Sequence, residues 1–163
     1  MPIQQVNLNI MSQWIMSRTN TGFATTVAGP DSINFTLTGI NTTTFNQLAP
    51  LQYTILTTAS QTVDLSALVN TVYESFGLLH ALTIVVSPVG SSVTIAPGAS
   101  NGLTWWFGGT TPTITVPAGG FFCFSEPVAG PGHVVDATHK TLLFTNNGGT
   151  TLTLSLLVIG STT

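Results

Sequence analysis

The sequence has very few charged residues. Of its 163 residues, two are Lys or Arg and five are Asp or Glu, so charged residues make up 4% of the chain, whereas soluble domains average about 25%. A protein that binds nucleic acid through its phosphates needs several basic residues on one face. The chain has no basic cluster and a formal net charge of −3. We therefore expect no nucleic-acid partner.

Long apolar runs and cysteine pairs are missing as well. A membrane-spanning helix needs about 18 or more consecutive apolar residues, and the apolar stretch at 152–159 is short and interrupted by Thr153 and Ser155. We expect no transmembrane helix and no membrane partner. The single cysteine, Cys123, cannot form an internal disulfide. With a phenylalanine on either side, it is predicted to be a small buried apolar residue.

The residue patterns of catalysis are also not evident. The five acids are scattered along the chain, and the paired glycines lack the lysine of a phosphate-binding loop. We therefore predict that the protein is not an enzyme and needs no cofactor.

One segment, residues 133–139, has a spacing that could suit a metal. His133, Asp136 and His139 would share one face of a helix, but the flanking Pro131-Gly132 and Val134-Val135 favour a strand and a turn. In a strand, residues three apart point to opposite faces. We predict turn residues and no metal, with a metal site between subunits as the alternative.

What the sequence does contain is alternation of apolar and polar residues, as in half-buried strands. Turn-forming Pro, Gly and Asn residues recur about every ten residues, which is typical of a sandwich or jelly roll. The predicted fold class is all-β, an antiparallel β-sandwich or jelly-roll-like domain with an N-terminal arm. One segment, residues 64–77, has the spacing of a short helix. The predicted strands are residues 5–10, 33–38, 51–58, 81–87, 92–96, 113–116, 120–125, 140–146 and 151–160.

The N-terminal part of the sequence differs from the rest. It has few tight turns and carries Met11, Trp14, Ile15 and Met16 among polar residues. We interpret residues 1–44 as an N-terminal arm or added strands, and residues 45–163 as the β-sandwich domain.

The segment at 103–124, LTWWFGGTTPTITVPAGGFFCF, is rich in aromatic residues and glycine. The glycine pairs at 108–109 and 119–120 are predicted to mark the two ends of one strand. If Trp105 and Trp106 lie in extended chain, one ring faces inward and the other outward. The outward ring is predicted to contact another subunit, because interfaces are rich in aromatic residues and poor in Lys and Glu. A carbohydrate-binding groove is the alternative use of such a ring.

Two segments carry a resemblance to a known group of proteins. TIAPGASNGLTWWFGGTTPTITVPAGGFFCFSEP and GHVVDATHKTLLFTNNGGTTLTLSLLVIGS resemble small β-rich structural proteins of tailed bacteriophages, in which an aromatic-glycine segment, a VPAGG turn and a closing hairpin recur. The resemblance covers about residues 60–163. It implies a virion component, most often one that decorates or cements the head, and it implies no catalytic residues.

The function expected from the sequence is therefore that of a non-enzymatic capsid decoration protein on the outer surface of a virion. Its expected partners are further copies of itself, as a trimer or larger ring, and the major capsid protein or another virion protein. The alternatives are a carbohydrate- or host-surface-binding module of a virion fibre and a self-assembling surface filament. The expected assembly contacts are Val6, Leu8, Ile10, Trp14 and Ile15 in the arm, and Trp105 or Trp106.

Overall fold

The computed structural model describes residues 5–20, 23–38, 47–69, 75–125 and 132–162. The chain divides into two compact units, Gln4–Ile40 and the remainder, which is Met1–Ile3 with Asn41–Thr163. We name the first unit the ribbon and the second the body, and describe each by itself.

The ribbon is a pair of long antiparallel strands, β1 (Gln5–Asn20) and β2 (Phe23–Thr38), described here by their backbone pairing. The predicted strands 5–10 and 33–38 pair with each other at the open end of this hairpin. Their register places apolar residues opposite one another: Val6 opposite Leu37, Leu8 opposite Phe35, and Ile10 opposite Ile33.

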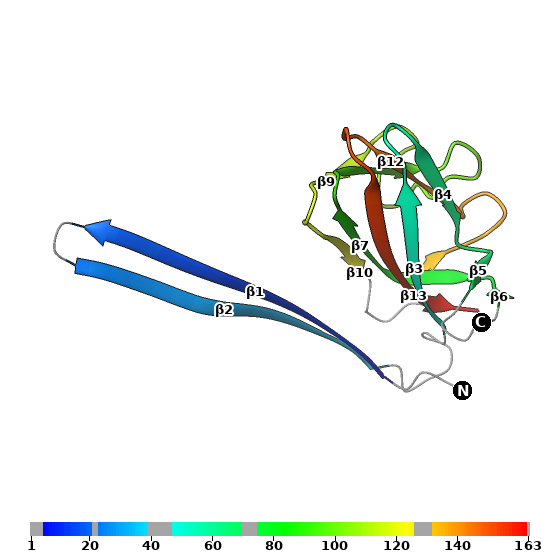
Figure 1. Cartoon of the computed structure of the whole chain (residues 1–163). Coiled ribbons are helices and arrows are strands. Elements are labelled where there is room, and N and C mark those ends of the chain that lie inside the picture. Colours follow the sequence, from blue (N-terminus) through cyan, green and yellow to red (C-terminus); the bar gives the residue numbers. More distant parts are fainter. Residues whose placement is uncertain (1–4, 21–22, 39–46, 70–74, 126–131, 163) are drawn as a thin grey trace. The chain divides into compact units, whose positions relative to one another are not determined.

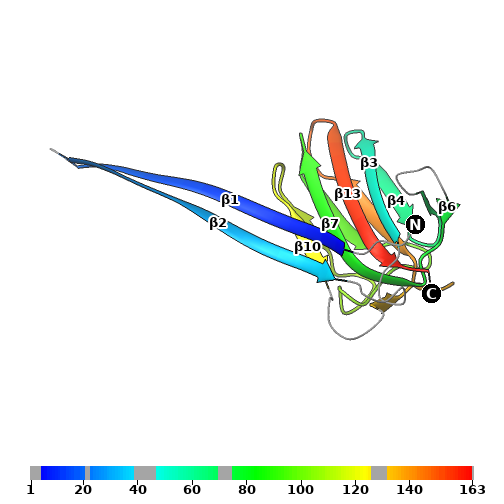
Figure 2. The same cartoon turned by 90° about the horizontal axis from the view of Figure 1, so that it is seen from below.

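The described residues of the body form two main antiparallel sheets that face each other (Figures 1 and 2). The strand order is β10-β7-β13-β3 in one sheet and β4-β12-β8-β9 in the other. The strands are β3 (Gln47–Ile55), β4 (Ser60–Asp64), β7 (His80–Val89), β8 (Val93–Pro97), β9 (Ile114–Val116), β10 (Phe122–Ser125), β12 (Thr141–Asn146) and β13 (Leu152–Ser161).

The connections identify the sandwich as a jelly roll. In each of the successive pairs β3 and β4, β7 and β8, β9 and β10, and β12 and β13, one strand belongs to each sheet. Of the successive pairs of these eight strands, only β8 and β9 share a sheet, and two four-stranded sheets joined in this way form the jelly-roll architecture. The predicted fold class is confirmed. Across the described residues, no helix is long and apolar enough to cross a membrane.

The predicted helix at 64–77 is wrong where the structure describes it. The carboxylate of Asp64 accepts hydrogen bonds from the backbone N–H and the hydroxyl of Ser66, at 2.8 and 2.6 Å, so the chain turns directly after β4. Two short strands, β5 (Leu68–Val69) and β6 (Ser75–Phe76), then pair with each other. The segment between them lies outside the described residues. A further short strand, β11 (His133–Val134), pairs with β7.

The core fills the space between the two sheets. Alternate residues of β7, β13, β8 and β12 point inward, and the largest of them, Phe144, is completely buried. Burying a side chain of this kind stabilises a fold by about 1.5–3 kcal/mol. The described core residues all lie between Ala49 and Ile159, so the body contains its own core.

A buried polar residue holds the turns together at one end of the sandwich. The side-chain amide of Asn146 donates to the backbone carbonyls of Ile55, Leu56 and Thr150, at 3.0, 3.2 and 2.8 Å. Its carbonyl oxygen accepts from Ser91 Oγ at 2.6 Å and from the N–H of Gly148 at 3.0 Å. The turns β3–β4, β7–β8 and β12–β13 are therefore tied to one side chain.

Candidate functional site

The two sheets of the body differ in their outer faces. On the β4-β12-β8-β9 sheet, Ser60, Thr145, Thr94 and Thr115 lie in one row across the four strands. Ser60 Oγ is 2.9 Å from Thr145 Oγ1, and Thr94 Oγ1 is 3.3 Å from Thr115 Oγ1. We name this surface the hydroxyl face. Its polar groups suit contact with water.

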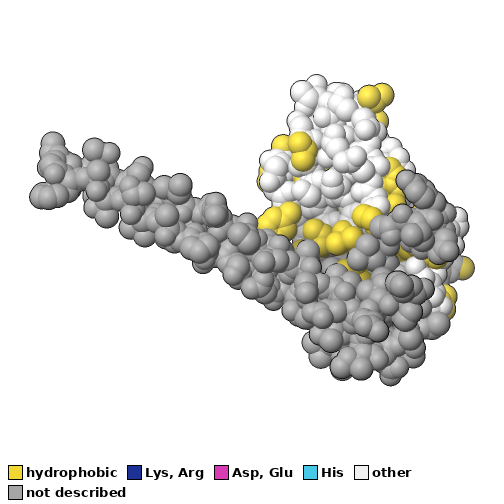
Figure 3. Space-filling view, turned by 60° about the horizontal axis from the view of Figure 1, so that its bottom comes forward, with side chains coloured by type: hydrophobic (Ala, Val, Ile, Leu, Met, Phe, Trp, Pro, Cys, Tyr) yellow, Lys and Arg dark blue, Asp and Glu magenta, His cyan; other side chains and the backbone are white. Residues whose placement is uncertain are grey.

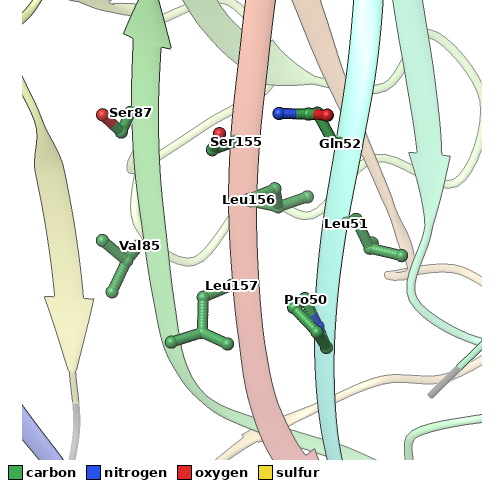
Figure 4. Close-up of a pocket in the computed structure, with 8 residues that line it drawn as sticks. All are labelled: Pro50, Leu51, Gln52, Val85, Ser87, Ser155, Leu156 and Leu157. Carbon is green, nitrogen blue, oxygen red and sulfur yellow. The ribbon is translucent and has the colours of Figure 1, made fainter. Parts of the chain in front are cut away.

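The outer face of the β10-β7-β13-β3 sheet carries a row of apolar residues across its four strands. The strand registers place Cys123, Val85, Leu157 and Pro50 opposite one another across the four strands. A groove of about 360 Å³ opens over the part of this row formed by Val85, Leu157 and Pro50, and we name it the sheet groove. Figure 4 shows Val85, Leu157 and Pro50 side by side in it, with a polar row of Ser87, Ser155 and Gln52 next to them.

No charged residue lies in the strands that form the sheet groove. The strands β10, β7, β13 and β3 contain no Asp, Glu, Lys or Arg. In the view of Figure 3, the described surface shows hydrophobic patches among uncharged polar groups and no charged side chain. An apolar groove on an uncharged sheet face has the composition of the central part of a protein interface, where charged residues are depleted.

The sheet groove is limited on one side. In the next row along the same face, Thr83 and Ile159 are fully buried, at 1% and 0% exposure, so the groove opens at Val85 and Leu157 and not beyond.

Cys123 is only partly buried, which corrects the prediction of a buried residue: its register with Val85 puts it on the outer face. Burial raises the pKa of the Cys123 thiol.

Prolines, short strands and one ion pair limit pairing at the free edges of the body. β3 contains Pro50, which removes a hydrogen-bond donor from an edge strand. β9 is three residues long and lies between Pro112 and Pro117, and β10 is four residues long. At the end of β4, Lys140 Nζ lies 2.9 Å from Asp64 Oδ2. The body therefore exposes little backbone for pairing with another sheet.

The tryptophan pair does not lie in a strand. Residues 105–107 form a turn, in which the N–H of Phe107 donates to the carbonyl of Thr104 at 3.1 Å. The prediction of one inward and one outward tryptophan is therefore wrong, because it assumed extended chain. Trp105 and Trp106 are both partly buried and pack against the core.

Both tryptophans belong to an aromatic cluster between β10 and β11. The ring of Trp105 stacks on that of His133, with centroids 4.3 Å apart and an angle of 22° between the planes. The ring of Trp106 lies 4.5 Å from that of Phe124. The Nε1 of Trp106 is buried and has no hydrogen-bond partner among the residues that the structure describes. The predicted strand between the two glycine pairs is present as β9, shorter than the interval between them.

The residues of the 133–139 segment are not arranged as three ligands of one metal. His133 is in β11 and stacks on Trp105, whereas Asp136 and His139 face each other in the following turn, with Oδ1 3.2 Å from Nδ1. Among the described residues, no group of three or more His, Cys, Asp or Glu side chains could hold a metal ion. Asp136 also accepts hydrogen bonds from the hydroxyl and N–H of Thr138, at 2.8 and 2.7 Å. These bonds, followed by those from His139, lower the pKa of Asp136 to about 2.

The expectation that no catalytic residue pattern is present is wrong for one spacing: residues 98–102, Gly-Ala-Ser-Asn-Gly, match a nucleophile elbow, which is a turn from a strand into a helix. Here they follow β8 and lead into another turn. Their glycines are explained by packing, since a Cβ on Gly98 would lie 2.1 Å from Thr141 Oγ1. That hydroxyl donates to the carbonyls of Ser100 and Asn101, at 2.6 and 3.0 Å. We assign this loop a structural role.

The predicted contacts Val6, Leu8, Ile10, Trp14 and Ile15 all lie in β1 of the ribbon. The sheet groove was not predicted from the sequence. A signal for it exists, because residues 84–86 and 156–159 are continuously apolar, whereas a strand with one face in water alternates. Such runs place apolar side chains on both faces of a sheet.

Comparison with known proteins gives no further identification. No protein-family model matches the chain, and no curated protein matches it significantly.

Proposed function

We propose that the protein is a structural component of a bacteriophage virion, a decoration or cement protein that binds the outer surface of the capsid. The observation that carries this proposal is the sheet groove, an apolar opening on a sheet face with no charged residue in its strands. Jelly rolls occur in viral capsid proteins and also in lectin domains, so the fold alone does not decide the function.

The mechanism is mechanical. A decoration protein that touches several shell subunits at once gains avidity, because each further contact forms within an assembly already held together. The near absence of basic residues supports a position on the outer surface and not against the genome, which is strongly anionic. The hydroxyl face, with its row of hydrogen-bonded Ser and Thr, is then the side that meets water.

The test uses capsids from which the protein has been removed genetically. Purified full-length protein is added, the capsids are sedimented, and the bound protein and the temperature of capsid rupture are measured. We expect binding to saturate at a fixed ratio to the capsid protein and to raise the rupture temperature. The variant Leu157→Lys, in the sheet groove, should bind at least about tenfold more weakly, because it would bury an unpaired charge.

The control is Thr115→Lys, which places the same charge on the hydroxyl face, where Thr115 is exposed. It should bind like the unchanged protein. An equal loss of capsid binding in both variants would contradict the assignment of the sheet groove. Capsids that neither bind the protein nor gain heat resistance would contradict the proposed function.

The aromatic cluster favours the second candidate function, a carbohydrate-binding module. Partly buried tryptophans beside His133 resemble the stacking surfaces on which sugar rings lie. Titration with a glycan library, followed by tryptophan fluorescence, distinguishes the two functions. Saturable quenching that is lost in Trp105→Ala would favour glycan binding over decoration.

A further inference from the structure

The ribbon is a structure that needs a partner. A two-stranded hairpin alone in water is marginally stable at best, and independent stability requires further strands or a packed apolar face. Within the described residues, β1 and β2 pair only with each other. Each strand therefore has one edge whose backbone groups are not paired in a sheet.

The ribbon is also too long for one body to cover. Each of its strands has 16 residues, which at about 3.4 Å per residue amounts to about 54 Å. The longest strands of the body, β7 and β13, have 10 residues, or about 34 Å at the same rise. Even if a body covered as much of the ribbon as one of its strands can span, about a third would extend past it. A second copy of the chain can cover this length.

The ribbon matches the sheet groove in composition. Residues 5–17 of β1 and 32–38 of β2 contain no charged residue, and Val6, Leu8 and Ile10 occupy alternate positions opposite three apolar residues of β2. In an extended strand, alternate residues share one face. A projecting row of apolar residues fits an open groove of about 360 Å³ better than a flat surface would fit that groove.

We propose that the ribbon of one copy binds the sheet groove of a second copy, with Val6, Leu8 and Ile10 against Val85, Leu157 and Pro50. This contact rests on the proposed function in one respect, since it supplies the homo-oligomer of the decoration protein. The sheet groove then contributes to capsid binding by joining copies that bind the capsid together. Because ribbon and groove are different surfaces, the contact is heterologous, and repeated copies close into a ring or continue as a filament.

The test is a complementation between two variants, measured by light scattering coupled to size-exclusion chromatography. The groove variant is the full chain with Leu157→Lys, which keeps its ribbon. The ribbon variant lacks residues 1–40 and keeps its groove; the described core lies wholly between Ala49 and Ile159, and circular dichroism checks that the body is folded. The unchanged chain should be multimeric and each variant alone monomeric. Mixed in equal amounts, the two should form a one-to-one complex.

Two further variants make the test specific. Thr115→Lys, on the hydroxyl face, should remain multimeric and serves as the matched control. Should the ribbon variant fail to fold, the full chain with Leu8→Glu and Phe35→Glu replaces it, because these residues are directly opposed in the ribbon and like charges at opposed positions destabilise the pair. A monomeric unchanged chain, or a truncated chain that stays multimeric, overturns the proposal. So does a mixture that stays separate, which would show that each ribbon binds its own body or that grooves pack against grooves.

The same samples separate this inference from the proposed function. If the variants complement each other but the multimer binds no capsid, the ribbon-to-groove contact stands and the decoration function fails. If capsids bind the protein but the mixture stays separate, the function stands and this contact fails.

Discussion

At the scale of single residues, Asn146 is the residue on which the turns of the sandwich depend. It is 1% exposed and donates to three backbone carbonyls, two from the end of β3 and one from its own hairpin. We predict that Asn146→Leu lowers the free energy of unfolding by about 3 kcal/mol or more, because each buried group left without a partner costs about 1–3 kcal/mol. Urea denaturation measures the change.

Two controls accompany this prediction. Asn147→Ala changes the neighbouring amide, which is exposed, and should alter the stability by no more than about 0.5 kcal/mol. Asn146→Asp keeps the shape but directs a carboxylate at the carbonyls of Ile55, Leu56 and Thr150. It should be destabilised most at neutral pH and recover in part as the acid takes up a proton. Equal stability of Asn146→Leu and Asn147→Ala would contradict the role of the amide.

Asp136 gives the protein a defined sensitivity to acid. Hydrogen bonds, first from the hydroxyl and N–H of Thr138 and then from His139, lower its pKa from 3.8 to about 2. A lowered pKa contributes stability above the unfolded value, and this contribution is lost as the pH falls from about 4 towards 2. Asp136→Asn should lack this part of the pH dependence. In Thr138→Val, NMR titration should find the pKa of Asp136 closer to 3.8; an unchanged pKa would assign the shift to another cause.

At the scale of the elements, the contact between β13 and β7 depends on a glycine. The register shifts between Ile159 and Gly160, and a Cβ on Gly160 would lie 2.3 Å from the carbonyl oxygen of His80. Gly160→Ala must separate the two strands, and we predict a loss of about 2 kcal/mol. Gly149→Ala is the control, since nothing lies within 4 Å of its Cβ position. Thermal unfolding of both variants checks the prediction, and similar melting temperatures would refute it.

Strands were predictable from the sequence wherever one face is buried, because alternation then follows directly from the pleat. The nine predicted strands all correspond to observed strands or their ends. The helix at 64–77 failed because Leu65 and Leu68 have helical spacing, whereas the carboxylate of Asp64 closes a turn that no apolar period reveals. The prediction that Trp105 and Trp106 face opposite sides failed for a related reason. A turn at 104–107 places the two neighbouring rings in one cluster.

The position of the sheet groove could not be predicted from the sequence for a different reason. Its apolar row comes from three strands that are distant in the chain, and only the register places Val85, Leu157 and Pro50 in line. The sequence predicted an assembly surface of low charge, but it could not say which face of which sheet provides it. The strand order decides that, because it separates the hydroxyl row from the apolar row.

At the scale of the whole molecule, the scarcity of charge has two structural consequences. In the body, prolines and short strands limit the pairing of edges, a task that charged side chains perform in many sheet proteins. In the ribbon, two 16-residue strands carry Arg18 and Asp31 as their charged residues. The proposed association of this chain would therefore depend on apolar contact and backbone hydrogen bonds much more than on ion pairs.

This dependence predicts how assembly responds to salt. Between about 0.05 and 1 M NaCl the Debye length falls from more than 10 Å to about 3 Å, which weakens contacts held by exposed charges. We predict that the dissociation constant of the multimer changes by less than about threefold over this range, because the contact proposed here contains no charged residue. Ammonium sulfate should strengthen the assembly, since excluded salts favour the burial of apolar surface. Analytical ultracentrifugation measures both effects, and dissociation of the multimer by NaCl alone would show that ion pairs hold it together.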